Sequence, residues 1–492
     1  MSLFHSKPVQ PPRVSTDTVI PLHYYDDTKV MRAFVLNLGM RFDDVLDPER
    51  LRAALERLCE LGNWRKIGAR LRLNDKGKLE YHIPEQFDAK RPGFIFSHDT
   101  YDMNIEDHPL AKRLPKPIDK PSLYEDGGNF DALTRRKDNP LTWEEFTQTD
   151  DPQMSLHVTS FRDATIVGFT WPHWLFDAMG KASFMQAFQS VLNGDENKVP
   201  PLEGFQTDPM VELGKTTPGE RHVLFSRLLQ GLSMYLFIFR FLFELLYWRK
   251  FESHVVCLPA KHVQSMRETA IEELADGSSE KERPFVSDGD VICAWWMKRA
   301  LQHLPRNSKR TVLVMNAFNL RSRLPKSFVQ GAGYAQNAVF AIYTLISVRD
   351  VFQKPISFLA AKIRHDIKEQ ATEEQLHALA AMQKQAIDKS GHGCIFGDSS
   401  IQLLAFSNWS KAKFYDIDLS TAVIREGTST GSRANHLGRP SYIQCTGKAH
   451  GMSTRFACPI IGQDAAGNYW LRAELPVSTW RKIDAQFAND QF

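Results

Sequence analysis

The chain has 492 residues, which is too many for a single hydrophobic core and predicts two large domains. Hydrophobic residues make up 42% of it, a share that supports a buried core and excludes an intrinsically disordered chain. Its 61 basic and 58 acidic residues are well mixed and leave a formal net charge of +3. No nucleic-acid-scale basic face is visible, so we expect no nucleic-acid partner.

The cysteines indicate a reducing compartment and no metal site. They form no Cys-x-x-Cys pair and show no zinc-ligand spacing. Reduced thiols are typical of the cytosol. The first residues, MSLFHSKPVQPPRV, lack the charged and then apolar segments of a signal peptide. The sequence therefore predicts a cytoplasmic protein that holds no metal. The six cysteines are Cys59, Cys257, Cys293, Cys394, Cys445 and Cys458.

The first half alternates between strand-like and helical segments. Asp47 followed by Pro48 is typical of a helix start, and leucines at helical spacing follow as far as Leu61. Residues 84–152 are rich in Pro, Asp and Lys and predict a long surface excursion. Two β-hairpins are expected from paired apolar runs. The expected strands are Val30–Leu38, Ile67–Leu73, Leu79–Ile83, Ser155–Phe161 and Thr165–Trp171.

The stretch Thr165–Gly180, TIVGFTWPHWLFDAMG, places a histidine where a strand gives way to a helix. The strand ends at Pro172, His173 follows at once, and Asp177 precedes a helix that we expect over Lys181–Leu192. Many proteins mount a general base at such a strand end, with a carboxylate that fixes the local turn. This context makes His173 a candidate catalytic base.

The His-x-x-x-Asp interval alone is weak evidence, because it occurs twice more in the chain. His23 and Asp27 share it, and so do His98 and Asp102. Neither of these copies lies between a strand and a helix. The strand-to-helix context, rather than the spacing, therefore separates the third copy from the other two.

The most apolar stretch is Val223–Trp248, VLFSRLLQGLSMYLFIFRFLFELLYW. Its longest charge-free run, Leu228–Phe239, is too short for a plain membrane span. Three interpretations stay open: a crossover helix buried in the protein, a helix that lies in a membrane surface, and a true span. On a helical wheel the polar residues share one narrow stripe, which Phe237 interrupts. They are Ser226, Gln230, Ser233, Arg240 and Glu244.

The second half repeats the α/β alternation. Ser287-Asp288-Gly289 is typical of a helix cap, and Gln463–Gly467 separates the two strands of a terminal hairpin. The expected helices are Ala260–Glu273, Asp290–Leu301, Ile356–Gln370 and Glu373–Asp388. The expected strands are His254–Leu258, Thr311–Phe318, Ile401–Phe406, Thr454–Ile461 and Asn468–Leu475.

The order of these features resembles the BAHD acyltransferases of the chloramphenicol-acetyltransferase-like superfamily over nearly the whole chain. His173 and Asp177 match the family signature His-x-x-x-Asp-Gly, with Ala178 where Gly is usual, as in fungal-type members. Asn319–Leu324 is similar to the family's Asp-x-Arg-x-Arg segment. Gly333–Asn337 is similar to the Gly-Tyr-Phe-Gly-Asn that follows it.

A third motif departs from the family pattern. Of the run Asp-Phe-Gly-Trp-Gly only Asp418 is present, and residues 419–422 replace the rest with Leu-Ser-Thr-Ala. In the family this motif is largely architectural, and its Asp pairs with an Arg. The resemblance makes that partner Arg321 here, or else Arg323.

The resemblance also implies roles for the site residues. His173 would take the proton from the attacking acceptor and then hand it to the departing CoA thiolate. Asp177 would be turned away from the substrate and would hold the loop through an Arg. The hydroxyls of Ser420 and Thr421, and Gly180 at the helix entry, are candidates for oxyanion or substrate contacts.

The implied fold is α/β, with two similar-sized domains, each a mixed β-sheet covered by helices, and an active-site channel between them. Their expected bounds are 1–205 for the N-terminal domain with His173, 206–255 for a crossover with the apolar helix, and 256–492 for the C-terminal domain. The implied partners are acyl-CoA as co-substrate, with acetyl as the expected acyl group, and a small secondary-metabolite hydroxyl or amine. No cofactor would be bound permanently, and the protein would act as a monomer.

Two other functions stay open. The altered motif at Asp418 is compatible with a repurposed relative that performs a CoA-independent cyclisation or rearrangement in the same channel. A non-catalytic ligand-binding or membrane-peripheral protein that kept only the fold is the alternative from a different class. Peripheral membrane contact through residues 223–248 is a separate expectation for any of these functions.

Overall fold

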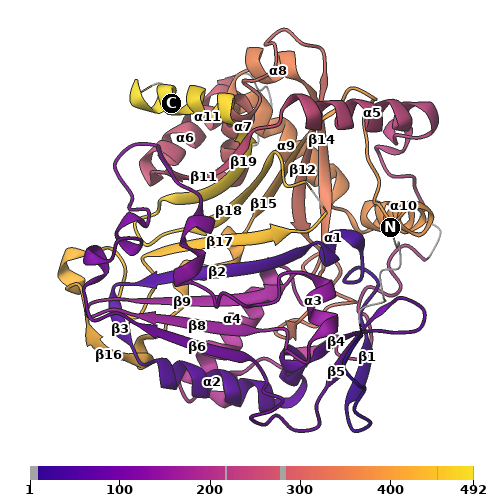
Figure 1. Cartoon of the computed structure of the whole chain (residues 1–492). Coiled ribbons are helices and arrows are strands. Elements are labelled where there is room, and N and C mark those ends of the chain that lie inside the picture. The colour runs from indigo at the N-terminus through magenta and orange to yellow at the C-terminus, as the bar shows by residue number, and fades with distance from the viewer. Residues whose placement is uncertain (1–8, 216–218, 277–283, 452, 491–492) are drawn as a thin grey trace, which may run out of the picture.

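The computed structural model describes residues 9–215, 219–276, 284–451 and 453–490. The first eight residues of the segment in which we expect no signal peptide therefore lie outside the described residues. The described chain forms two mixed α/β halves that lie against each other, as the fold class predicted (Figure 1). Each half is organised around one large sheet.

The first large sheet has the strand order β17-β2-β9-β8-β6. Its central strand β9 is buried along its whole length. Gly168 in β9 lets the backbone of Thr134 approach closely, since an added Cβ would lie 1.7 Å from the carbonyl oxygen of Thr134. The strands are β17 (Tyr442–Ala449), β2 (Phe34–Phe42), β9 (Thr165–Pro172), β8 (Ser155–Ser160) and β6 (Ile95–Thr100).

The second large sheet has the strand order β14-β12-β15-β18-β19-β11-β7. Its β18 and β19 are antiparallel neighbours, which confirms the expected terminal hairpin. The strands are β14 (Val339–Ser347), β12 (Thr311–Asn319), β15 (Gln402–Asn408), β18 (Ala457–Gln463), β19 (Tyr469–Pro476), β11 (Phe251–Leu258) and β7 (Ser122–Tyr124).

The two large sheets exchange edge strands. β17 comes from the last part of the sequence and pairs with β2 of the first sheet, while β7 from the first part pairs with β11 of the second sheet. Neither sheet is therefore built from one half of the sequence alone. Three small sheets complete the described set: β1 (Thr18–Pro21) with β5 (Leu79–Ile83) and β4 (Arg70–Leu73), β10 (Leu202–Glu203) with β13 (Gly333–Tyr334), and β16 (Val423–Glu426) with β3 (Asp44–Leu46).

Helices cover the outer faces of the sheets (Figure 1). α2 and α4 pack with the first sheet in one apolar core, and α6, α7, α9 and α11 pack with the second sheet in another. The helices are α1 (Lys29–Arg32), α2 (Pro48–Glu60), α3 (Trp143–Gln148), α4 (Ala178–Leu192), α5 (Gly231–Tyr247), α6 (Ala260–Asp276), α7 (Asp288–Ala300), α8 (Val348–Gln353), α9 (Ile356–Gln370), α10 (Glu373–Ser390) and α11 (Val477–Ala488).

Local signals predicted the helix starts well. The Asp47 carboxylate accepts from two backbone N–H groups at the start of α2, and Ser287 forms a capping box at the start of α7. The expectation for residues 84–152 is only partly right, because this stretch also supplies β6, β7 and α3. The expected strand Val30–Leu38 also begins later than predicted. α1 occupies Lys29–Arg32, and the strand β2 starts at Phe34.

The apolar stretch forms α5, and the structure bears on two of its three interpretations. Phe237 is the one buried residue of this helix, so the expectation of a crossover helix buried in the protein is wrong. None of the helices in the described ranges has the length and hydropathy needed to cross a membrane, so the structure gives no support to a true span.

Candidate active site

His173 lies directly after β9, in the loop that leads into α4. The loop is anchored to both halves of the molecule. The backbone N–H of His173 donates to the carbonyl oxygen of Phe34 on β2 at 2.9 Å, and its carbonyl oxygen accepts from the Asn337 side chain at 2.8 Å. The residue is partly exposed, and its ring centroid lies 6.2 Å from that of Phe34. Its backbone is therefore fixed on both sides, while the ring atom Nδ1 is buried without a hydrogen-bond partner among the described residues.

Asp177 is buried and serves the loop rather than the ring. One of its oxygens accepts from the backbone N–H of Gly180 at 2.8 Å and caps α4. The other accepts from Arg321 and from the backbone N–H of Ala338, each at 2.9 Å. Burial alone would raise the pKa of Asp177, but Arg321 and the backbone donors outweigh it and hold that pKa below its usual value.

Arg321 is where the expected pairing needs correction. It binds Asp177 instead of Asp418, and it also donates to the carbonyl oxygen of Gln336 at 2.8 Å. Asp418 accepts from the backbone N–H of Ser420 at 2.9 Å and so caps its own turn. The structural pair that spans the two halves is thus Asp177 with Arg321, and the motif around Asp418 has no part in it.

The candidate oxyanion contacts are also corrected. Thr421 bonds to Asn193 at the C-terminal end of α4, and the backbone N–H of Asp418 donates to Gln189 near the same end. α4 has 15 residues and is about 22 Å long, so Ser420 and Thr421 lie far from His173.

Gly180 is excluded as an oxyanion donor for a different reason. Its backbone N–H already donates to Asp177, so it is not free for a substrate. Gly180 instead allows its neighbours to pack closely, because an added Cβ would lie 2.8 Å from the carbonyl oxygen of Tyr334 and 2.6 Å from the Cβ of Phe176. A glycine at this point lets α4 pack against the segment that carries Asn337.

Sequence reasoning missed a buried charged group next to the histidine loop. One oxygen of Asp26 accepts from both the backbone N–H and the side-chain amide of Asn337, at 2.7 and 2.8 Å. The same amide bonds to the carbonyl oxygen of His173, so Asn337 links Asp26 to the histidine loop. The charge of Lys66 interacts with that of Asp26, and Lys66 donates to the carbonyl oxygen of Ala335 at 2.7 Å. The one available signal was the family-like segment Gly333–Asn337, since nothing in the sequence singles out Asp26 or Lys66.

The charges in this cluster are strongly perturbed. Burial raises the pKa of Asp26 and lowers that of Lys66, while the attraction between the two groups acts against both shifts. Burial likewise lowers the pKa of His173, and its own carbonyl, Asp177 and Asn337 act in the opposite direction. A lowered pKa keeps the imidazole neutral near pH 7, which is the form that accepts a proton.

A cavity of about 400 Å³ lies beside the strand ends that lead to His173. It reaches Val35 on β2, which is the register partner of Pro172. Residues from both halves line it: Val35, Asn37, Asp126, Gly128, Asp131, Arg135, Leu141, Thr170, Thr446, Gly447, Lys448 and Arg472.

Most charges in this cavity are neutralised in pairs. Arg135 bonds to Asp131 at 2.9 Å, and Arg472 bonds to Asp126 at 2.7 Å. Lys448 also lines the cavity, and within the described residues it forms no such ion pair. The lining therefore suits an uncharged polar molecule better than a polyphosphate.

The chain is similar to known proteins in a family model and in sequence. A family model described as "Transferase family" matches residues 253–421. "Acetyltransferase sphE" from Aspergillus fumigatus is 41% identical over 504 residues, which cover 99% of this chain and 98% of that protein. "Transcriptional regulator calD" from Penicillium decumbens is 40% identical over 496 residues and is covered to 99%, as is this chain.

The similarity extends to solved structures. The crystal structure of F. graminearum TRI101 complexed with coenzyme A and T-2 mycotoxin matches with a TM-score of 0.67, covering 95% of this chain and 97% of that one. Its sequence identity of 12% means that it shows the fold alone. The relatives that match over nearly the full length of the chain show the family as well as the fold. By its sequence relatives, its fold and its family match, the chain belongs to the transferase family as a fungal BAHD-type acyltransferase.

Proposed function

We propose that the protein transfers an acyl group, in the first place acetyl, from acyl-CoA to a hydroxyl or amine of a small secondary-metabolite acceptor, with His173 as the general base. The observation that carries this proposal is the state of His173. The residue is partly exposed, burial favours its neutral form, and its backbone is bonded on one side to Phe34 of the same sheet and on the other to Asn337 of the second half. The related acetyltransferases support the acetyl group as donor moiety.

The chemistry follows from a neutral imidazole in this place. His173 takes the proton of the acceptor O–H or N–H as that atom attacks the thioester carbonyl carbon. The tetrahedral intermediate then collapses, the C–S bond breaks, and the imidazolium returns the proton to the leaving thiolate. The products are the acylated acceptor and free CoA, and the histidine is neutral again. Asp177 stays outside these steps, because its carboxylate is fully engaged with Arg321 and two backbone donors.

We further propose that the cavity beside β2 and β9 holds the acceptor. Asn37, Thr170 and Thr446 line it with polar side chains that are bonded among themselves and to Thr134 and Asp131, and the paired charges leave it nearly neutral. Leu141→Trp would fill part of this cavity from a loop. We expect it to raise KM for the acceptor and to leave KM for acetyl-CoA unchanged. An increase confined to acetyl-CoA would assign the cavity to the donor.

We propose that the enzyme works as a monomer in the cytoplasm, with CoA as a co-substrate and no permanently bound cofactor. All six cysteines are free and buried, which suits a reducing compartment. Peripheral membrane contact through α5 is part of this proposal and is developed below.

The decisive experiment measures release of free CoA thiol from acetyl-CoA in the presence of a panel of fungal alcohols and amines. We expect acceptor-dependent release and an acetylated product by mass spectrometry. A thermal shift of the protein by CoA, measured without acceptor, tests donor binding independently.

The same assays distinguish the rival functions. Conversion of a candidate substrate without acetyl-CoA, together with no thermal shift by CoA, would establish a CoA-independent rearrangement instead. A ligand-induced shift with no turnover of any panel member would point to a non-catalytic binding protein. The relative named as a transcriptional regulator makes this second outcome worth testing.

A further inference from the structure

α5 is apolar on its outer face as well as on the face where Met234, Phe237 and Phe241 pack on the protein. In an ordinary surface helix the apolar stripe packs on the core and the charged residues face water. Here the row Leu232, Tyr235, Phe239, Leu242 and Leu246, at spacings of three and four residues, points away from the protein. Leu232, Tyr235 and Phe239 are each more than 70% exposed. The helix runs along the edge of the molecule near α8 and β14 (Figure 1).

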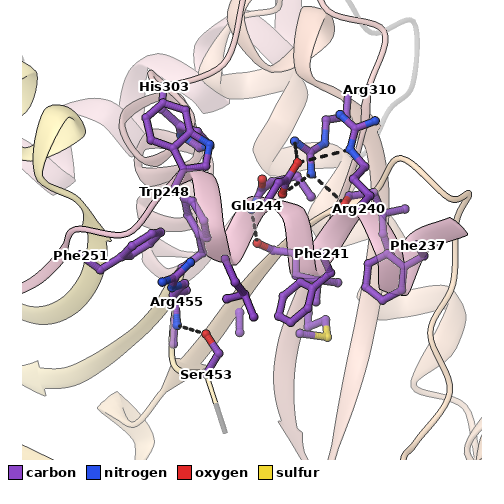
Figure 2. A pocket seen from close by; sticks show the side chains of 18 residues that line it. Phe237, Arg240, Phe241, Glu244, Trp248, Phe251, His303, Arg310, Ser453 and Arg455 are labelled. Atoms are coloured by element: carbon purple, nitrogen blue, oxygen red, sulfur yellow. Dashed lines mark hydrogen bonds and ion pairs between the residues drawn. The ribbon is translucent and has the colours of Figure 1, made fainter. Parts of the chain in front are cut away.

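Of the polar stripe seen in the sequence, Glu244 faces the protein, whereas Ser226, Gln230, Ser233 and Arg240 are exposed. Glu244 accepts from Arg310 of the second half at 2.7 Å and from Arg240, one turn away, at 3.3 Å. These side chains and Phe237 point into a cavity of about 150 Å³ between the helix and the second sheet (Figure 2). The ion pair of Glu244 with Arg310 thus ties the helix to the second half in this orientation.

Charges at both ends of α5 are basic and exposed. Residues 221–250 contain five basic residues and one acidic residue. Arg240 pairs with the single acid, Glu244. Arg221 and Arg227 precede the helix, and Arg249 and Lys250 follow it, all of them exposed. An apolar row between basic ends matches an anionic lipid surface, whose acyl boundary takes the row and whose headgroups bind the cations.

We propose that α5 lies in the interface of an anionic membrane and anchors the protein there peripherally. A second copy of the chain is a poorer fit for this face. A helix of 17 residues is about 25 Å long and about 10 Å wide, so it offers about 250 Å² per partner. A stable dimer needs about 800 Å² per partner. The basic ends would also repel the same ends of a second copy.

The aromatic residues of this segment also fit a membrane. Tyr235, Tyr247 and Trp248 are of the types that favour a membrane–water boundary.

Flotation of the full-length protein with vesicles tests this inference. We expect weak binding to phosphatidylcholine vesicles and about tenfold more binding when phosphatidylserine makes up half of the lipid. Phe239→Ser with Leu246→Ser removes exposed apolar surface that packs on nothing, and we expect it to abolish flotation. The matched control is Val329→Ser with Ile424→Ser, which removes similarly exposed apolar side chains elsewhere and should bind like the wild type.

A charge variant and a measurement of oligomeric state complete the test. Arg249→Gln with Lys250→Gln should reduce the preference for phosphatidylserine and keep the weak binding to phosphatidylcholine. Wild-type protein that floats with neither vesicle overturns the proposal. A wild-type dimer that Phe239→Ser with Leu246→Ser dissociates, without vesicle binding, also overturns it and assigns the face to a second copy. Neither result bears on acyl transfer, which is assayed separately.

Discussion

Two copies of the same His-x-x-x-Asp interval, at His173 and at His23, lie in very different surroundings. His173 is partly exposed at the end of β9, and of its ring nitrogens only Nδ1 is buried without a hydrogen-bond partner in the part of the chain that the structure describes. His23 is 8% exposed, and both of its ring nitrogens are buried in this way. Burial, with the charge of Lys66, lowers the pKa of His23 to about 3. His23 and Asp27 also lie between a strand, β1, and a helix, α1, which corrects the expectation that only the His173 copy has this context. Spacing and context are therefore common to both copies, and access to a proton donor is not.

The acids of the two copies differ as much as the histidines. Asp177 joins the halves through Arg321 and Ala338, whereas Asp27 bonds to Arg32 only five residues away. The first carboxylate organises a loop between domains, and the second stabilises a local turn. The comparison teaches that the motif gains its function from what the acid is bound to and from whether the ring can be reached.

The largest expected effect is at the base itself. His173→Ala should lower kcat for acetyl transfer by about 10²–10⁴, because a positioned base contributes that much to such a step. Steady-state release of CoA thiol measures it. His98→Ala is the matched control from the third copy of the motif, since His98 is exposed on β6 and bonds to Ser160 at 2.9 Å. Equal activity of both variants would contradict the assignment of His173.

The next largest effect is on stability. Asp177→Asn removes the charge that pairs with Arg321 and should lower the free energy of unfolding by about 3 kcal/mol. Because the pKa of Asp177 is lowered, its contribution is present above the unfolded value of about 4 and is lost as pH falls through the folded value. The difference in free energy of unfolding between wild type and variant, measured by urea titration, should thus narrow below about pH 4.

Asp102→Asn is the control for that measurement. Its carboxylate is exposed and bonds only to Arg162 among the described side chains. We expect a change within about 0.5 kcal/mol. If the two variants were equally destabilised, Asp177 would not be the link between the halves.

A smaller effect is expected from the link that the sequence did not reveal. Asn337→Ala frees the carbonyl oxygen of His173 and removes the side-chain donor to Asp26, while the backbone N–H of residue 337 still donates to Asp26. A small displacement of the base costs rate, so kcat should fall about tenfold with KM for both substrates unchanged. A loss of stability with normal kcat per folded molecule would make Asn337 merely structural.

Local features of the fold were predictable, and long-range ones were not. Asp47 and Ser287 predicted helix starts correctly, because an N-cap bonds only to backbone groups in the first turn of its own helix. The edge-strand exchange was missed, because β17 pairs with a strand about 400 residues earlier and no local pattern encodes that choice. The apolar stretch Val223–Trp248 was recognised as a helix with a polar stripe, but which face would turn inward depended on Arg310 from another part of the chain.

The site shows the same limit. The family resemblance identified the segments that meet, and His173 with Asp177 among them. It assigned Arg321 to Asp418, because motif order does not say which acid an arginine reaches in three dimensions. Asp26 and Lys66 escaped notice because charged residues are usually exposed, and their burial follows from packing of segments far apart in the sequence.

The smallest effect on activity is expected at His23, and it isolates what burial does to the same residue type. His23→Gln keeps a polar side chain and removes the titration, so kcat near neutral pH should not change. The buried imidazole has a folded pKa of about 3, and the unfolded chain binds a proton at about 6.5. The unfolded state thus holds more protons between these values, and the wild type loses about 1.4 kcal/mol for each unit that the pH falls within that window. The Gln variant should lack this slope in denaturant titrations between pH 6.5 and about 4.5. Parallel slopes for both proteins would mean that His23 is as accessible to protons as His173, and the contrast between the two copies would then have to rest on their acids alone.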